Sequence, residues 1–202
     1  MIKINDNIFQ FENLRVGQMY LIIQDEDITL VDTGMIGDLS SIKKQLSDMD
    51  ISFEQINNII ITHHHMDHTF NLKKISKLSD AKIYIHEGDY DKIKNKVKEL
   101  KIIMINDGDT LSILNNMEVI HVKGHTDGNI ALYARDYKLL IAGDCIFNNN
   151  GFAYPPKKYN TNTEVFMKNV RRLLDYDIKV ICPGHGLYVD ENCKELLEKL
   201  IK

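Results

Sequence analysis

Apolar runs that stop at an aspartate or a histidine constrain the fold of this chain more than any other feature. Such runs occur twice in each half of the sequence, at Leu30–Asp32, Ile59–His63, Ile141–Asp144 and Val180–His185. In each half, the run that stops at aspartate precedes the run that stops at histidine. This repeated order predicts two similar βα halves that face each other, with polar residues gathered at one edge. Helices covering two stacked sheets would give a four-layer αββα sandwich of the α/β class.

Short β-rich runs alternate with amphipathic stretches, and no linker separates them. The patterns predict strands at Tyr20–Ile23, Ile28–Val31, Asn58–Ile61, Lys82–Ile85, Glu118–Val122, Asn129–Tyr133, Leu139–Ala142 and Lys179–Ile181. They predict helices at Leu39–Met49, Leu72–Leu78, Tyr90–Leu100, Glu164–Leu174 and Glu191–Ile201. We therefore expect one domain covering residues 1–202, a length at which a core forms without staples.

Composition indicates the cellular compartment and excludes some classes of partner. The formal net charge of -4 argues against a broad electrostatic grip on nucleic acid. The three cysteines are widely spaced and form no CxxC pair, which is typical of a reducing compartment. The N-terminal segment lacks the apolar run of a signal peptide, and no stretch approaches the ~20 apolar residues of a membrane span. We expect a cytoplasmic protein without nucleic-acid or membrane partners, and a homodimer stays open.

The densest chemical signal is the hexapeptide HHHMDH at His63–His68, which holds four imidazoles and one carboxylate. These groups are zinc ligands, and one zinc takes about four of them. The preceding run is a predicted strand, so alternation turns His63 and His65 to one side and His64 to the other. One loop can therefore offer ligands to a first metal and to a neighbouring one.

The pattern H-x-H-x-D-H resembles the signature of the metallo-β-lactamase superfamily, and further motifs match in order. The segment Val31–Gly34 is similar to the family's V-D-T-G, and Gly124–Gly128 to its G-H-T-x-G. The pair at Gly143–Asp144 resembles its G-D, and Pro183–Gly186 its closing G-H-G. The resemblance runs from about residue 18 to residue 187 and is more specific for the fold than for the substrate.

This resemblance implies a dinuclear metal centre with two zinc ions, or alternatively iron or manganese. Asp144 would bridge both metals together with a water or hydroxide, and Asp67 would also be catalytic by orienting the nucleophile or accepting a proton. The remaining ligands would divide into His63, His65 and His125 for one metal, and Asp67, His68 and His185 for the other. Two dications facing two carboxylates and a hydroxide leave one positive charge, which suits a small anionic substrate.

Among relatives, the chain looks most like the glyoxalase II-like hydrolases, which cleave thioesters such as hydroxyacylglutathione. It ends soon after His185, without room for a C-terminal helical domain, and Thr69–Asn71 replaces the glycines that often follow the first motif. Some other small thioester, ester or lactone is therefore the expected substrate. Phe147 stands where quorum-quenching lactonases carry a tyrosine, which disfavours that reading.

Other classes stay open. Persulfide dioxygenases share similar motifs but use one iron held by two histidines and an aspartate, and a metal-binding protein without catalysis is a further alternative. The stretch Phe147–Thr163 is either a substrate-binding loop or a decorated surface loop. The sequence does not decide whether its candidate contacts reach the substrate: Tyr154, Lys157, Lys158 and Tyr159.

The sequence suggests simpler roles for three other polar residues. Asp32 either accepts hydrogen bonds that hold the ligand loops or is a plain turn residue. His86 ends a strand before Glu87 and Gly88, which predicts a surface turn. His121 lies between apolar residues, so alternation sends it to the opposite face from both.

Overall fold

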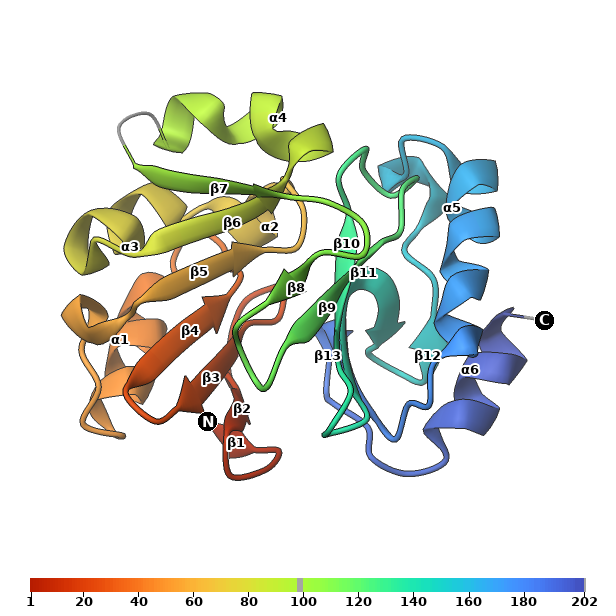
Figure 1. The fold of residues 1–202 in the computed structure, drawn as a ribbon, viewed down its shortest axis with the longest axis horizontal. Helices are drawn as coiled ribbons and strands as arrows, with labels where there is room; N and C mark the ends of the chain where they lie inside the picture. The colour runs from red at the N-terminus through yellow and green to blue at the C-terminus, as the bar shows by residue number, and fades with distance from the viewer. Residues whose placement is uncertain (98–99, 202) are drawn as a thin grey trace.

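Two sheets stacked face to face, with helices outside each, form the protein (Figure 1). The structure is a computed structural model and describes residues 1–97 and 100–201. The first sheet runs in sequence order, and its last four strands pair in parallel. Its strands are β1 (Ile2–Lys3), β2 (Ile8–Gln10), β3 (Tyr20–Gln24), β4 (Asp27–Val31), β5 (Asn58–Ile61), β6 (Lys82–His86) and β7 (Lys101–Ile105).

The second sheet has the order β12-β11-β10-β9-β8, and β13 pairs in parallel with β11. Its strands are β8 (Thr110–Leu111), β9 (Met117–His121), β10 (Ile130–Ala134), β11 (Leu139–Asn148), β12 (Phe152–Ala153) and β13 (Val180–Gly186). The pairing of β11 with β13 shifts register twice beyond Ile141, so both strands continue irregularly through their polar ends.

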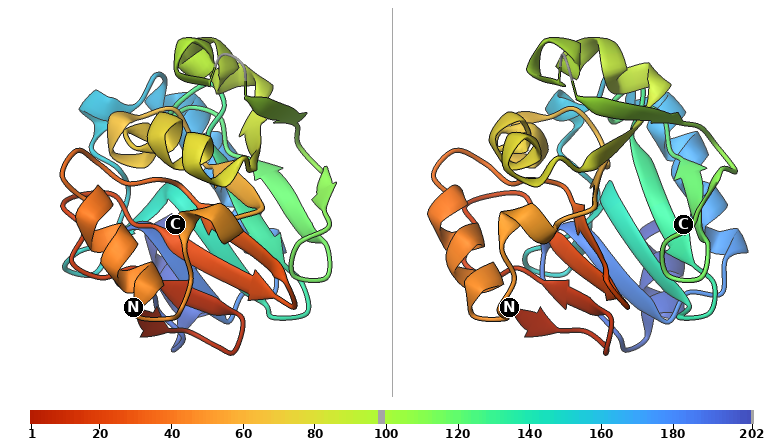
Figure 2. Two further views of the ribbon diagram at one scale, coloured as in Figure 1. Left: turned by 90° about the vertical axis from the view of Figure 1, so that its left-hand side faces the viewer. Right: turned by 60° about the vertical axis from the view of Figure 1, so that its left-hand side comes forward.

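The helices lie on the outer faces of the sheets, and Figure 2 shows α1 and α3 in front of the first sheet when that side is turned forward. The α-helices are α1 (Leu39–Ser47), α2 (Met66–Thr69), α3 (Leu72–Ser79), α4 (Glu87–Val97), α5 (Thr163–Asn169) and α6 (Cys193–Ile201). Short 3-10 helices are η1 (Phe53–Gln55), η2 (Lys157–Tyr159) and η3 (Val170–Asp175). Within the part of the chain that the structure describes, no helix is long and apolar enough to cross a membrane.

Strand alternation divides the core into three layers of apolar contact. On β5, Ile59 and Ile61 pack against α1, α3 and α4, whereas Ile60 faces the second sheet. On β9, Val119 faces the first sheet and Ile120 packs against α5, η3 and α6. Three apolar layers require four layers of secondary structure, which confirms the predicted αββα sandwich.

The structure changes several predicted element boundaries. The helix predicted at Tyr90–Leu100 begins at Glu87 and ends at Val97, and residues 98 and 99 of that prediction lie outside the described residues. The helix predicted at Glu164–Leu174 divides into α5 and the 3-10 helix η3. An apolar residue every third or fourth position fits either helix type, so the pattern could not separate them. The short strands β1, β2, β8 and β12 and the strand β7 were not predicted.

The carboxyl ends of parallel strands gather the polar residues at one edge of the sandwich. Asp32 and His63 follow the neighbouring strands β4 and β5 of the first sheet. Asp144 and His185 lie in the irregular ends of β11 and β13 in the second sheet. The repeated order of aspartate and histidine runs thus corresponds to one parallel strand pair in each sheet.

Candidate metal centre

Four side chains from three separate segments form a first cluster of metal-ligating groups. They are His63, His65, His125 and Asp144, whose ligand atoms all lie within 4.8 Å of one another. His63 Nε2 lies 3.1 Å from His65 Nδ1. Apart from His65 at the cleft, these side chains are buried. Such a set of imidazoles and a carboxylate matches the ligand types that zinc takes.

A second cluster lies beside the first and consists of Asp67, His68 and His185. Asp67 Oδ2 is 3.3 Å from His185 Nε2 and 3.6 Å from His68 Nε2. The short helix α2 carries Asp67 and His68, directly after the strand-loop segment that carries His63 and His65. The single hexapeptide therefore supplies side chains to both clusters.

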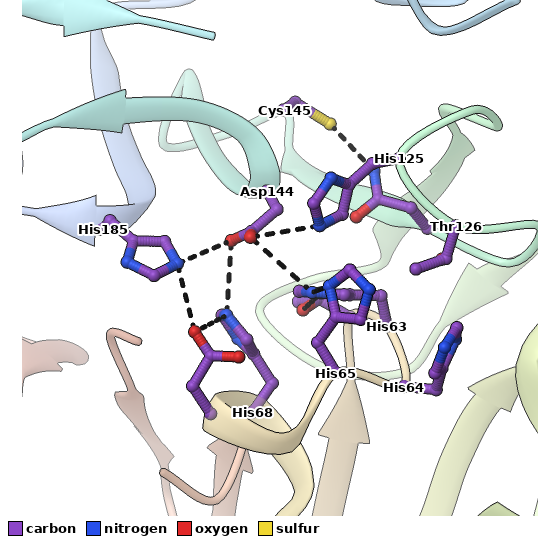
Figure 3. A network of polar contacts seen from close by, with 12 residues as sticks. His63, His64, His65, His68, His125, Thr126, Asp144, Cys145 and His185 are labelled. Carbon is purple, nitrogen blue, oxygen red and sulfur yellow. Dashed lines mark hydrogen bonds and ion pairs between the residues drawn. The ribbon is translucent and has the colours of Figure 1, made fainter. Parts of the chain in front are cut away.

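The Asp144 carboxylate lies between the clusters and presents one oxygen to each (Figure 3). Its Oδ2 is 3.2 Å from His125 Nε2 and 3.6 Å from His63 Nε2. Its Oδ1 is 3.2 Å from His68 Nε2 and 3.3 Å from His185 Nε2. A carboxylate with this placement has the geometry of a bridge between two neighbouring ions.

Gly184 permits this close approach of β13 to Asp144. A Cβ atom at residue 184 would lie 2.2 Å from Asp144 Oδ1 and 2.5 Å from the Gly143 carbonyl oxygen. Both separations are shorter than a real Cβ atom tolerates, so the Pro-Gly-His-Gly motif needs a glycine here for packing.

Hydrogen bonds on the outer nitrogens orient the imidazoles. His68 Nδ1 lies 2.8 Å from Asp32 Oδ2, and His125 Nδ1 lies 2.9 Å from Asn160 Oδ1. The Thr62 hydroxyl donates to Asp32 Oδ2 at 2.7 Å and lies 3.1 Å from His63 Nδ1. A proton held on each Nδ1 leaves the lone pair of Nε2 aimed inward, which is the arrangement that metal-bound histidines use.

The buried carboxylate of Asp89 joins the two ligand-bearing loops. Oδ2 accepts the backbone N–H of His64 at 2.8 Å and the Thr126 hydroxyl at 2.8 Å. Oδ1 accepts the backbone N–H of Gly128 at 2.8 Å, and His64 Nδ1 lies 3.0 Å from Oδ2. Asp89 therefore ties the segment before α2 to the segment around His125.

The surroundings shift the pKa values of the histidines differently in the two clusters. Burial lowers the pKa of His65 to about 4, and nearby His125 acts in the same direction. Burial and the neighbouring His68 also hold the pKa of His63 well below its usual range. Burial alone would lower the pKa of His185, but its contacts with Asp144 and Asp67 raise it to about 8. Without a bound cation, His63 and His65 are thus neutral near pH 7, whereas His185 holds a proton that a metal must displace.

An open cleft of about 470 Å³ leads to the clusters. Five members of the two clusters line its floor: His65, Asp67, His125, Asp144 and His185. Its walls are apolar or aromatic and comprise Val16, Met35, Met66, Phe147, Pro156 and Tyr159. Of the loop residues whose contact with substrate the sequence left undecided, Tyr159 lines the cleft, and Tyr154, Lys157 and Lys158 do not.

The other histidines lie outside both clusters among the described residues. His64 points away from the metal-ligating groups and contacts Asp89 (Figure 3). The surface turn predicted at His86 is wrong, because this side chain is buried and stacks on His121 with ring centroids 3.8 Å apart. Sequence reasoning missed both Asp89 and Asn160, whose partners lie 25 to 39 residues away along the chain and leave no local pattern.

Comparisons with known proteins agree with the fold and the motifs. Beta-lactamase-like protein 2 homolog of Caenorhabditis elegans is 26% identical over 179 residues, covering 86% of this chain and 58% of its own length. A hydroxyacylglutathione hydrolase of Psychromonas ingrahamii is 27% identical over 184 residues, covering 88% of this chain and 64% of its own length. The chain thus spans less than two thirds of the length of either relative.

A solved structure shows the same fold. The crystal structure of a metallo-beta-lactamase family protein from Thermus thermophilus matches with a TM-score of 0.77 and 19% identity, over 98% of this chain and 79% of that one. The model of the metallo-beta-lactamase superfamily matches residues 13–185 of the chain. This range includes every residue of both clusters. The chain therefore belongs to the metallo-beta-lactamase superfamily.

Proposed function

We propose that this protein is a metal-dependent hydrolase that uses a dinuclear zinc centre to cleave a small thioester, ester or lactone. His63, His65 and His125 would hold one ion, and Asp67, His68 and His185 would hold the other. Asp144 would contribute one carboxylate oxygen to each. The observation that carries the proposal is the placement of Asp144, whose two oxygens face different clusters at 3.2 to 3.6 Å from their imidazoles.

The donor set fits a pair of cations. His68 Nε2, His125 Nε2 and Asp144 Oδ1 are buried without a hydrogen bond of good geometry among the described residues. Burial alone would raise the pKa of Asp144, yet His68 and His63 hold it well below its usual range, so the group is a carboxylate. Buried polar atoms that converge without partners are costly unless an ion or water satisfies them.

A pair of bound divalent ions supplies a water of lowered pKa and a Lewis acid for the substrate oxygen. The chain's own groups set the geometry: the outer hydrogen bonds of His63, His68 and His125 fix the direction of each imidazole. Asp67 lines the cleft, and in this proposal it orients the attacking water and takes its proton. In thioester hydrolysis, the water oxygen bonds to the acyl carbon, the carbon–sulfur bond breaks, and the thiol leaves with the proton.

Other side chains near the centre do not compete as nucleophiles. Burial raises the pKa of the Cys145 thiol, next to Asp144, to about 12. Burial raises the pKa of Cys182 as well. Both thiols therefore stay protonated near neutral pH, and a nucleophilic thiolate is not available from them.

The hydroxyacylglutathione hydrolases among the relatives support the thioester assignment. The second cluster supports a dinuclear centre. A mononuclear iron dioxygenase that uses two histidines and one aspartate would need only part of this donor set. Because the first cluster alone, which includes Asp144, would be enough for such an enzyme, the dioxygenase is the alternative outcome of the test.

The test is elemental analysis and turnover on the same freshly purified protein. Close to two zinc ions per chain, with hydrolysis in a panel of thioesters, esters, lactones and phosphoesters and no oxygen uptake, is the expected result. One iron per chain with oxygen uptake on a persulfide, and no hydrolysis in the panel, would overturn the proposal.

A further inference from the structure

The cleft above the clusters has walls of one chemical kind. Every lining residue outside the clusters is apolar or aromatic, and the Tyr159 hydroxyl is the one polar side-chain group that they bring. Val16 and Met35 come from loops of the first half of the chain, and Phe147 and Pro156 come from the second half. The apolar walls are therefore built by both halves of the sandwich.

Several of these apolar side chains are unusually open to solvent. Val16 is 45% exposed, Met66 56% and Tyr159 54%. A cluster of exposed apolar side chains beside a polar centre is typical of a ligand site. Phe147 stacks at a tilt on His185, with ring centroids 4.0 Å apart, so the apolar wall begins directly at the second cluster.

The described walls of the cleft also lack cationic side chains. No lysine or arginine is among the cleft-lining residues that the structure describes, and Lys157 and Lys158, next to Pro156, do not line it. A carboxylate on the substrate, other than one at the metals, would therefore meet no lysine or arginine among the residues that line the cleft. The Lys158 ammonium lies over the Tyr159 ring, 4.8 Å from its centroid, outside this lining. An anion that the apolar walls remove from water without a partner is disfavoured.

We infer that the substrate carries an apolar acyl chain, which lies along Val16, Met35 and Phe147 with its carbonyl carbon at the clusters. The inference rests on the proposed hydrolase function and narrows it to apolar acyl thioesters or esters. The thiol or alcohol leaves through the open mouth, because natural thiol carriers are polar and the walls offer them few partners. The substrate preference is then set by the acyl chain and not by a glutathione-like carrier.

The test compares acyl thioesters of a single small thiol, N-acetylcysteamine, with the zinc-loaded protein. From acetyl to butanoyl to hexanoyl, kcat/KM should rise about two- to fourfold per methylene, the upper figure corresponding to about 0.8 kcal/mol. Succinyl, which has the length of butanoyl but ends in a carboxylate, should be cleaved at least about tenfold less efficiently. Equal or falling values along the series, or a preference for succinyl, would overturn the inference.

A charge-introducing variant locates the effect in the cleft. Val16→Lys should lower the ratio of hexanoyl to acetyl turnover and raise the ratio of succinyl to butanoyl turnover. The matched control is Leu174→Lys, because Leu174 is also an exposed apolar residue but lies on η3, outside the cleft. Unchanged ratios in Val16→Lys, or equal changes in both variants, would place the apolar chain elsewhere and contradict the inference.

Binding separates this inference from the proposed function. If no thioester or ester is cleaved, the hydrolase assignment fails, and calorimetry with free carboxylates still tests the walls. Hexanoate should bind the zinc-loaded protein more tightly than butanoate, and butanoate more tightly than succinate. The reverse order would overturn the inference whether or not the protein is a hydrolase.

Discussion

Asp32 and His68 are joined by a contact of 2.8 Å between Oδ2 and Nδ1, and Asp32 also reaches the first cluster through Thr62. The same oxygen accepts the Thr62 hydroxyl, which lies 3.1 Å from His63 Nδ1. One carboxylate thus orients His68 directly and His63 through Thr62. Of the two sequence readings of Asp32, the structure favours the one in which it holds the ligand loops.

Asp32→Asn should weaken metal binding without removing a ligand. The amide has one acceptor oxygen and cannot serve Thr62 and His68 as the carboxylate does, so both imidazoles lose a fixed orientation. We expect metal affinity to fall about 10- to 100-fold, measured by zinc titration against a chelating dye. Asp91→Asn, an exposed residue on α4, is the control and should match the wild type. Wild-type affinity in Asp32→Asn would show that the contact does not position the imidazoles.

His63→Ala and His64→Ala should differ sharply despite their adjacency. His63 lies in the first cluster, whereas His64 lies against Asp89 and keeps its backbone hydrogen bond in the alanine variant. The first variant should lose at least one metal and most activity, and the second should retain both metals. Elemental analysis and a turnover assay measure the difference, and an equal loss in both variants would contradict the division of roles.

Asp89→Asn should destabilise the fold and loosen the first cluster. Two backbone N–H groups and the Thr126 hydroxyl donate to the carboxylate, and His64 Nδ1 also lies 3.0 Å from it. An amide would leave at least one of these donors unpaired in a buried place. The free energy of unfolding should fall by about 2 to 3 kcal/mol, measured by denaturant titration of the zinc-loaded protein. The Asp91→Asn control should change little, because that side chain is exposed and pairs with Lys94. A loss no larger than in the control would show that Asp89 does not hold the loops.

The sequence was sufficient to predict the sandwich because strand alternation and the polar strand ends are local patterns. Ile59, Ile60 and Ile61 look alike in the sequence, but their alternation places them in different apolar layers. The hexapeptide at His63–His68 is also local, and the structure brings its side chains together with His125, Asp144 and His185. The residues that position these groups were harder to predict. Asn160 and Asp89 act through contacts that depend on the folded chain, and Gly184 matters through what lies against it.

His86 shows why a turn-like context misled the sequence reading. Glu87 and Gly88 begin helix α4, so the polar residues after the strand belong to a helix start and not to an exposed turn. The imidazole of His86 therefore lies between α4 and β9. It stacks on His121 of β9 and accepts the backbone N–H of Gly88 at 3.0 Å. The missing information was the position of β9, which is distant in the sequence.

The burial of His86 in this stacked pair should make stability depend on pH. Burial and the neighbouring His121 lower the pKa of His86 below its usual value of about 6.5, so the unfolded chain takes up the proton more readily. The stabilising contribution is present above about pH 6.5 and is lost as the pH falls through that value toward the folded pKa. His86→Gln should therefore lose less unfolding free energy than the wild type between about pH 7.5 and 5.5. Parallel pH profiles by denaturant titration would rule out this contribution.

The most direct test of the account is anomalous X-ray diffraction from crystals of the zinc-loaded protein, recorded on both sides of the zinc absorption edge. Two zinc peaks should appear about 3.5 to 4 Å apart, one beside Asp144 Oδ2 with His63, His65 and His125, and one beside Oδ1 with Asp67, His68 and His185. In Asp144→Asn crystals the peaks should lose occupancy or separate. A single zinc peak in the wild type, or two peaks that Asp144 does not join, would contradict the dinuclear centre.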